Sequence, residues 1–347
     1  MKRVGWIDTA RYVAIFHIVF IHVLDKFSPY VLSFWVTPPY SYLPFLFCAK
    51  DAVLFFCILL GFFASKPHFF SMSGFARYTV KRYFQFSFFI LLTGLVYVCA
   101  SYGVTWLFHS PDPSAYRVIC DGAKYNIVYV LRDAFLFEDT YNATLWSMQQ
   151  FFFASIICWL LGCVFRRCSR PVNLAVSAAA AAAFLIPGSE YLSWIGFCVM
   201  GAFARVCLEN ADSIRLLDRR AIRIILLIAA VILYKLPESS TSYFLYVVAS
   251  ILLLLVCFRS PGVQRTLGKE PLPQLGRIAF GVYVVHTPVN SILYSSLYPP
   301  VSRLLPEWCT VLIFFILCIS ISTACAWLLD RAYRVLLSRF SHEKLKV

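Results

Sequence analysis

Long apolar segments alternate with short polar connections along most of this chain. Runs of about 17 to 25 apolar residues are long enough to cross a bilayer as helices. They recur about every 30 positions, which is the pattern of a polytopic helical membrane protein. We therefore predict an all-α transmembrane bundle of about ten helices. The predicted spans cover residues 12–32, 43–63, 84–104, 145–165, 172–187, 190–207, 222–236, 242–258, 276–297 and 308–329.

The basic residues divide unevenly between the two sides of the membrane that ten spans would define. Most lie in the even-numbered loops and near the two ends of the chain. The odd-numbered loops hold only seven of the 31 lysines and arginines: Lys26, Lys50, Arg117, Lys124, Arg132, Lys235 and Arg303. The positive-inside rule therefore predicts cytoplasmic termini, in agreement with an even number of spans. The same distribution accounts for most of the net charge of +14 without a nucleic-acid partner.

The composition argues against a water-soluble domain and against a disulfide framework. Only 14% of the residues are charged and 61% are hydrophobic, far from the balance of a soluble domain. Most of the 13 cysteines lie inside apolar spans at irregular spacing, without a C-x-x-C pair or a Cys/His ligand cluster. We expect them to be small buried hydrophobic residues, and we expect no metal site. The first apolar run is long enough to span and lacks a small-residue cleavage site, unlike a signal peptide.

One predicted outer loop, residues 105–144, is much longer than the others. A loop of this length is either functional or disordered. Its segment YNIVYVLRDAFLF has a helical apolar pattern that would suit the membrane surface. A lid, a substrate-facing element and a passive connector are all compatible with this pattern. We predict a single transmembrane domain over residues 1–335, followed by a short basic cytoplasmic tail over residues 336–347.

The first apolar segment carries ionisable side chains at helical spacing. A helix turns about 100° and rises about 1.5 Å per residue, which places Arg11 and His22 within about 20° of each other and about 16 Å apart. Asp8 lies near the same stripe, whereas His17 points elsewhere. Ionisable groups in a membrane span are costly and usually functional. We therefore interpret the stripe of Arg11 and His22 as the candidate active site.

Five short elements occur in a fixed order along the chain. They are Ile7-Asp8-x-x-Arg11 with His22, the run LFFCILLGFF from Leu54 to Phe63, Arg77-x-x-x-Lys81-Arg82, the run NATLWSM from Asn142 to Met148, and the segment from Leu275 to Pro288 that ends in VYVVHTP. Together they resemble the membrane acyltransferase-3 family, which O-acylates sugars and other cell-surface molecules. The resemblance covers nearly the whole chain. Two positions depart from the family pattern: Leu60 replaces a serine, and Gln85 stands where a further basic residue is common.

The resemblance implies an integral membrane O-acyltransferase of the plasma or inner membrane. It would transfer an acetyl group from cytoplasmic acetyl-CoA to a hydroxyl of a cell-surface polysaccharide or lipid-linked sugar. Acyl-CoA is then a donor substrate, and no bound cofactor is expected. The other expected partners are the glycan acceptor, membrane lipids and possible glycan-biosynthesis proteins, with no nucleic acid. Direct transfer and transfer through an acyl-enzyme are both open.

Each candidate residue has a role that fits this chemistry. His22 would act as the general base on the acceptor hydroxyl, because imidazole titrates near neutral pH; alternatively it is a histidine hydrogen-bonded to a neighbouring helix. Asp25 would either orient that ring or cap the end of the helix. Arg11, Arg77, Lys81 and Arg82 would hold the phosphates of the donor, although they could also merely obey the positive-inside rule, Arg77 most of all. Tyr283 and His286, three residues apart on one helix face, would either line the acceptor or acyl pocket or merely pair helices. Trp146 would either line the pocket or belong to the aromatic belt at the membrane interface.

A different class of function also fits intramembrane His and Arg residues. A secondary transporter or flippase would use His22 in proton coupling. Against it, the chain shows no matching halves with paired Gly/Pro-broken segments, which inverted repeats would produce. A purely structural membrane subunit is a third possibility, but it would not need Arg11 and His22 on one stripe.

Overall fold

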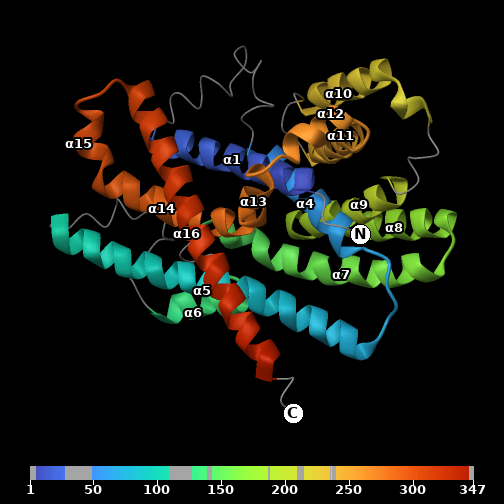
Figure 1. The fold of residues 1–347 in the computed structure, drawn as a ribbon, viewed down its shortest axis with the longest axis horizontal. Helices are drawn as coiled ribbons and strands as arrows, with labels where there is room; N and C mark the ends of the chain where they lie inside the picture. The colour runs from blue at the N-terminus through green and yellow to red at the C-terminus, as the bar shows by residue number, and fades with distance from the viewer. Residues whose placement is uncertain are drawn as a thin grey trace. The chain divides into compact units, whose positions relative to one another are not determined.

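The computed structural model describes residues 5–27, 49–108, 127–138, 143–186, 188–208, 215–234, 236 and 240–343. These residues form helices and contain no strand, so the all-α prediction is confirmed for them (Figure 1). Each of the ten predicted spans overlaps one long helix, and two of them also overlap a short helical element. These helices are α1 (Gly5–Phe27), α4 (Ala49–Ala64), α5 (Met72–Phe108), α7 (Met148–Arg167), α8 (Arg170–Leu185), α9 (Glu190–Leu208), α10 (Arg220–Tyr234), α11 (Ser240–Phe258), α14 (Ala279–Ser296) and α16 (Glu307–Glu343).

Among the described residues, six short helical elements connect the long helices. They are α6 (Ile127–Leu136), η2 (Ala143–Ser147), η4 (Arg215–Asp218), α12 (Pro261–Leu267), α13 (Leu272–Arg277) and α15 (Tyr298–Ser302). The helix α6 coincides with the helical pattern predicted within the long outer loop. Most of the remaining part of that loop, residues 109–126 and 139–142, lies outside the described residues.

Length and composition support five to six membrane crossings within the described residues, against the ten predicted. Five helices of the described residues are long and apolar enough to cross a membrane, within the ranges Gly5–Asp25, Met72–Ala100, Leu145–Arg167, Glu190–Leu208 and Glu307–Leu336. A sixth would be the bent pair α11 and α12. By contrast, α4 has 16 residues and rises only about 24 Å, less than the thickness of a hydrocarbon core. The chain is therefore a multi-pass membrane protein, but the count of ten and the side of the termini are not confirmed.

Two helices extend beyond their predicted ends. Helix α5 begins at Met72, twelve residues before the predicted start, so Arg77, Lys81 and Arg82 lie within its first turns. Ser71 caps this end, because its hydroxyl accepts a hydrogen bond from the backbone N–H of Gly74 at 3.0 Å. Helix α16 continues to Glu343, so most of the predicted tail is helical.

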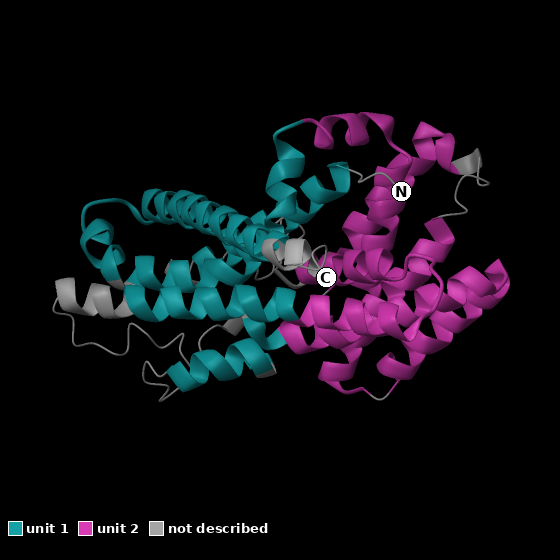
Figure 2. Ribbon diagram, turned by 60° about the horizontal axis from the view of Figure 1, so that its bottom comes forward, with its two compact units in different colours: residues 1–33, 84–146, 270–347 teal, residues 34–83, 147–269 magenta. Residues whose placement is uncertain are grey.

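The chain divides into two compact units, coloured separately in Figure 2. Unit 1 comprises residues 1–33, 84–146 and 270–347, and unit 2 comprises residues 34–83 and 147–269. In unit 1, α1 packs against α13, α14 and α16. The phenyl rings of Phe16 and Phe20 meet the ring of Phe315 edge to face. The hydroxyls of Tyr12 and Thr323 share a hydrogen bond of 2.7 Å between α1 and α16.

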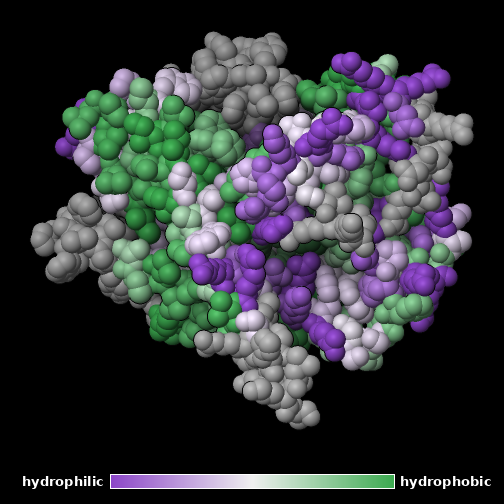
Figure 3. Space-filling model, in the orientation of Figure 1, coloured by the Kyte–Doolittle hydropathy of each residue, from purple (hydrophilic) through white to green (hydrophobic). Residues whose placement is uncertain are grey.

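Apolar side chains also cover the outer face of unit 1. Figure 3 shows hydrophobic residues gathered over α14, α15 and the adjacent part of α16. The exposed apolar residues of α16 include Trp308, Leu312, Ile313 and Ile316. A continuous exposed apolar surface of this kind is expected where a helix faces lipid.

Unit 2 is built on a close crossing of α4 and α9. A Cβ atom at Gly61 would lie 1.7 Å from the carbonyl oxygen of Cys198, and one at Gly201 would lie 2.2 Å from the carbonyl oxygen of Ile58. Glycine at these positions lets the two backbones touch, as is common between membrane helices. The buried Arg205 of α9 completes the contact, because its Nη1 donates to the carbonyl oxygen of Phe62 at 2.9 Å. It thereby satisfies a carbonyl group in the last turn of α4.

The close crossing of α4 and α9 predicts that one added methyl group at Gly61 lowers the stability of the protein. Gly61→Ala should lower the apparent Tm of the detergent-solubilised protein, because the added Cβ meets backbone atoms that cannot move aside. Overpacking of this kind costs roughly 1–3 kcal/mol. Gly262→Ala is the matched control, since nothing lies within 4 Å of its added Cβ. Equal Tm values for the two variants, measured by thermal unfolding and size-exclusion chromatography, would contradict the close crossing.

Candidate active site

The predicted stripe on the first helix is present on one continuous helix, α1. Near its start, Nη1 of Arg11 lies 3.3 Å from Oδ1 of Asp8, so the two form an ion pair. The carboxylate of Asp8 is nearly buried, whereas the guanidinium of Arg11 is 28% exposed. Gly276 of α13 packs directly on this turn, because a Cβ there would lie 1.9 Å from the carbonyl oxygen of Asp8. The turn of α1 that contains Asp8 and Arg11 is thus held in place by α13, which comes much later in the sequence.

Farther along α1, His22 meets a second histidine. Its Nδ1 lies 2.9 Å from Nε2 of His286 on α14, and the two rings stack at an angle of 20° with centroids 5.1 Å apart. His286 is completely buried and His22 is partly buried. A second bond joins the same two helices, because Nδ2 of Asn290 donates to the carbonyl oxygen of His22 at 3.0 Å. This His22–His286 pair was not predicted, since the sequence analysis placed the two residues in different roles.

The partners of the pair determine which nitrogens carry protons when both rings are neutral. Nδ1 of His286 lies 2.7 Å from the carbonyl oxygen of Tyr283. A carbonyl can only accept, so Nδ1 of His286 carries the proton and its Nε2 is an acceptor. The proton between the rings must then belong to Nδ1 of His22. Nε2 of His22 is left with a free lone pair, and it makes no hydrogen bond to any residue that the structure describes.

The remaining residues predicted for this site take different positions around the pair. Tyr283 is buried, and its ring centroid lies 5.9 Å from that of His286. Asp25 is exposed one turn beyond His22, and no hydrogen bond joins the two side chains in the described part of the chain. His286, rather than Asp25, therefore holds Nδ1 of the His22 ring. Trp146 is partly buried in η2, and its role stays a prediction.

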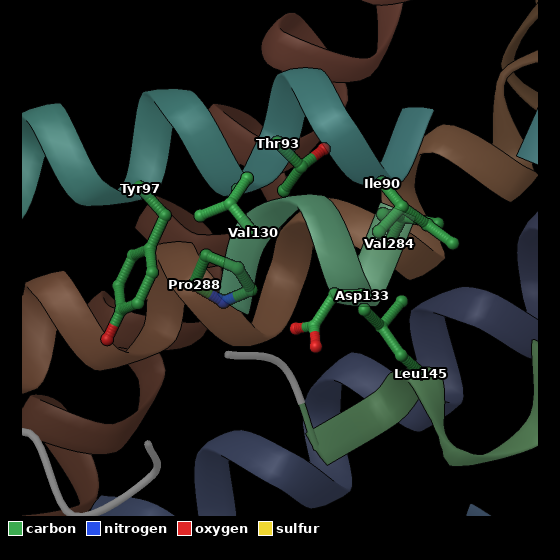
Figure 4. A pocket seen from close by; sticks show the side chains of 9 residues that line it. Ile90, Thr93, Tyr97, Val130, Asp133, Leu145, Val284 and Pro288 are labelled. Carbon is green, nitrogen blue, oxygen red and sulfur yellow. The ribbon is translucent and has the colours of Figure 1, made fainter. Parts of the chain in front are cut away.

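A small cavity lies on the other face of α14. Figure 4 shows Asp133 of α6 and Leu145 of η2 beside Val284 and Pro288 of α14. The cavity measures about 10 Å³, which is the space of about one water molecule. Positions 284 and 288 point roughly opposite to position 286 on a helix. Helix α6 of the outer loop is thus packed into unit 1 by Val130 and Asp133, although not against the His22–His286 pair.

The three predicted donor-binding residues belong to unit 2. Arg77 and Lys81 are exposed on α5, and neither forms an ion pair with a described residue. Arg82 is partly buried and packs on Tyr78: its Nε donates to the tyrosine hydroxyl at 3.3 Å, and the guanidinium lies 5.6 Å from the ring centroid. The ring of Tyr78 in turn stacks on Trp159 of α7 with centroids 5.7 Å apart. Only Arg82 of the three is therefore fixed by side-chain contacts.

Unit 2 also contains a pair that the sequence analysis missed. Sγ of Cys163 on α7 lies 3.1 Å from Nε2 of His68. The two residues are 95 positions apart, so no motif spacing signals their contact. The expectation of cysteines that act only as small hydrophobic residues does not describe this one. In the described residues, no group of three or more His, Cys, Asp or Glu side chains is arranged to hold a metal ion.

Comparison with known families decides the identity of the chain. A family model described as an acyltransferase domain, that of the acyltransferase-3 family, matches residues 4–328, nearly the whole chain. The chain belongs to the acyltransferase-3 family. The predicted resemblance is thereby confirmed, and the protein is a membrane acyltransferase. No curated protein and no solved structure matches it.

Within this acyltransferase, the hydrogen bonds around His22 predict a definite tautomer for each ring. At neutral pH, Nδ1 should be protonated and Nε2 bare in both His22 and His286. Solid-state NMR of histidine labelled with ¹⁵N distinguishes protonated from bare ring nitrogens. Spectra of His22→Ala and His286→Ala would assign the signals. A His22 ring protonated on Nε2 and bare on Nδ1 would contradict the arrangement.

Proposed function

We propose that this acyltransferase transfers an acetyl group from acetyl-CoA to a hydroxyl of a cell-surface polysaccharide or lipid-linked sugar, with His22 as the general base. The family supports acyl transfer. The observation that carries the role of His22 is the hydrogen-bonded chain from Tyr283 through His286 to His22. It leaves a lone pair on Nε2 of a partly buried imidazole, as a general base requires.

In the proposed reaction, His22 both accepts the proton of the acceptor hydroxyl and returns it to the leaving group. Nε2 of His22 takes the proton of the acceptor hydroxyl while the hydroxyl oxygen attacks the carbonyl carbon of the thioester. The bond between that carbon and the sulfur of CoA then breaks, and the proton passes from His22 to the departing sulfur. The products are an acetyl ester and free CoA. During the step, Nδ1–H of His22 keeps donating to His286, which stabilises the charged ring.

His286 acts in this proposal as a positioning residue. Its Nδ1 donates to a backbone carbonyl, and its Nε2 fixes the rotation and the tautomer of His22. The hydroxyl of Thr287 lies 3.3 Å from the same Nε2 and can donate to it. A ring fixed in this way keeps its base on the correct nitrogen, which matters more for the rate than for substrate binding.

The basic residues fit a donor that carries several phosphate charges. Arg77, Lys81 and Arg82 lie within about one and a half turns at the start of α5, which concentrates positive charge at one end of a membrane helix. Arg11 adds a guanidinium at the start of α1. Under the positive-inside rule both places are cytoplasmic, where acyl-CoA is available.

His22→Ala should remove acetyl transfer, with a loss on the order of 10²–10⁴-fold typical of a missing general base. Isolated membranes that contain the protein would be incubated with radiolabelled acetyl-CoA, and alkali-labile acetate would be counted in the glycan and lipid fractions. His286→Gln keeps an acceptor within reach of Nδ1 of His22, whereas His286→Leu removes it. We expect the Gln variant to retain more activity than the Leu variant.

Full transfer by His22→Ala would overturn the assignment of the base. Equal activities of the Gln and Leu variants would overturn the positioning role of His286. Absence of acetyl transfer and CoA release for the wild type, together with flux of a glycan across proteoliposomes, would favour the transporter.

Arg82→Gln tests the donor side. It should raise KM for acetyl-CoA by roughly tenfold with little change in kcat, because a lost charge-assisted hydrogen bond costs about 1.5 kcal/mol. Arg265→Gln removes an exposed charge from α12 and serves as the control. If both variants raise KM equally, the effect comes from the general positive charge of the protein and not from a phosphate site at Arg82.

A further inference from the structure

Cys163 and His68 form a nucleophile–base pair at one end of unit 2. Sγ of Cys163 lies 3.1 Å from Nε2 of His68, and Nδ1 of His68 lies 2.6 Å from the carbonyl oxygen of Lys66. The carbonyl can only accept, so in the neutral ring Nδ1 is protonated and the lone pair of Nε2 faces the thiol. The S–H group of Cys163 therefore donates to His68. A nucleophile, a base and a group that orients the base are the elements of an activated thiol.

The fold brings these groups together through a close backbone contact. A Cβ at Gly162 would lie 2.5 Å from the carbonyl oxygen of Lys66 and 2.8 Å from the ring of His68. The backbone N–H of His68 donates to the carbonyl oxygen of Gly162 at 3.2 Å. The ring of His68 also packs on Trp159, with centroids 4.2 Å apart. The segment that follows α4 is thus fixed on α7 at the turn that carries Cys163.

Two arginines, Arg82 and Arg166, belong to the surroundings of the Cys163–His68 pair. Tyr78 stacks on the same Trp159, and the guanidinium of Arg82 packs on the ring of Tyr78. Three successive ring contacts thus link Arg82 to His68. Arg166, one turn beyond Cys163, lies 4.7 Å above the ring of Phe69. Guanidinium groups in this part of unit 2 could hold the phosphates of an acyl-CoA whose thioester reaches the sulfur of Cys163.

We propose that Cys163 is an acyl-accepting thiol that acyl-CoA acylates with His68 as the base, an inference that rests on acyl-CoA as the donor in the proposed function. Nε2 of His68 takes the thiol proton while Sγ attacks the thioester carbonyl. The bond from the carbonyl carbon to the CoA sulfur breaks, and the proton passes from His68 to that sulfur. The products are a thioester on Cys163 and free CoA. One thioester replaces another, so no oxidant or reductant is needed.

The surroundings single out Cys163 among the described cysteines. Cys57, Cys158 and Cys198 are fully buried, and none of them contacts an imidazole in the described part of the chain. Cys168 is exposed but likewise has no imidazole beside its thiol there. Cys163 is 7% exposed. Among these cysteines, it is the one whose thiol faces an imidazole.

Peptide mass spectrometry of the purified full chain in detergent, after incubation with radiolabelled acetyl-CoA, tests the proposal. We expect an acetyl group on Cys163 that neutral hydroxylamine removes, as expected of a thioester. Cys163→Ser should lose this label. His68→Gln should slow its formation on the order of 10²-fold, since it lacks the base. Size-exclusion chromatography and thermal unfolding establish that both variants fold.

Cys168→Ser is the matched control at the same end of α7, and it should leave the labelling of Cys163 unchanged. Nonspecific chemical acetylation would label the exposed Cys168 before Cys163, and that result would overturn the proposal. An unchanged labelling rate in a folded His68→Gln variant would overturn it as well. The absence of label on Cys163 in the wild type, whose fold is not in question, would do the same.

The His22→Ala variant separates this inference from the proposed function. It should still acquire the label on Cys163 while it loses transfer to the glycan and lipid fractions. Wild-type transfer without any label on Cys163 would overturn the acyl-accepting thiol and leave the proposed function standing. A label on Cys163 without any transfer to a hydroxyl would support the thiol and overturn the proposed function.

Discussion

The hydrogen bond between His22 and His286 is the interaction on which the candidate site depends. A neutral imidazole in an apolar bundle still has one donor and one acceptor, and either is costly to leave without a partner. His286 meets both needs, with the carbonyl oxygen of Tyr283 on one side and the ring of His22 on the other. Nε2 of His22 is therefore the ring nitrogen of the pair that has no hydrogen-bond partner among the described residues. A group left open in this way is better explained by a reaction than by packing.

Close backbone contacts supply the rigidity that such a bond needs. In unit 1, Gly276 lets α13 reach the backbone of Asp8, while Asn290 binds the carbonyl oxygen of His22. In unit 2, Gly61 and Gly201 let α4 and α9 touch. Lipid provides little apolar driving force between helices, so contact distance and hydrogen bonds decide their packing. The glycines are therefore as important for the position of the functional groups as the polar side chains are.

The sequence predicted the helices well and the contacts between them poorly. Apolar length locates each helix because the signal is local, and the spacing of Arg11 and His22 fixes their common face by helix geometry alone. The count of ten crossings is not confirmed, because a crossing needs length as well as hydropathy and α4 has 16 residues. The pairing of His22 with His286 spans 264 positions, and that of Cys163 with His68 spans 95. Nothing in a single sequence encodes such contacts, because they arise from tertiary packing.

The two histidine pairs share one hydrogen-bond arrangement but serve different purposes. In each, a backbone carbonyl two or three residues before the histidine binds Nδ1 and turns the lone pair of Nε2 toward a partner. For His286 the partner is another imidazole. Nδ1 of His22 then carries the proton between the rings, and the lone pair on Nε2 of His22 is available to a group from outside the protein. For His68 the partner is the thiol of Cys163, so the base faces a nucleophile of the chain itself. The first arrangement suits the activation of a substrate hydroxyl, and the second suits an acyl group held by the protein. Because their partners differ, the two pairs have separable chemistry, although the same backbone rule builds both.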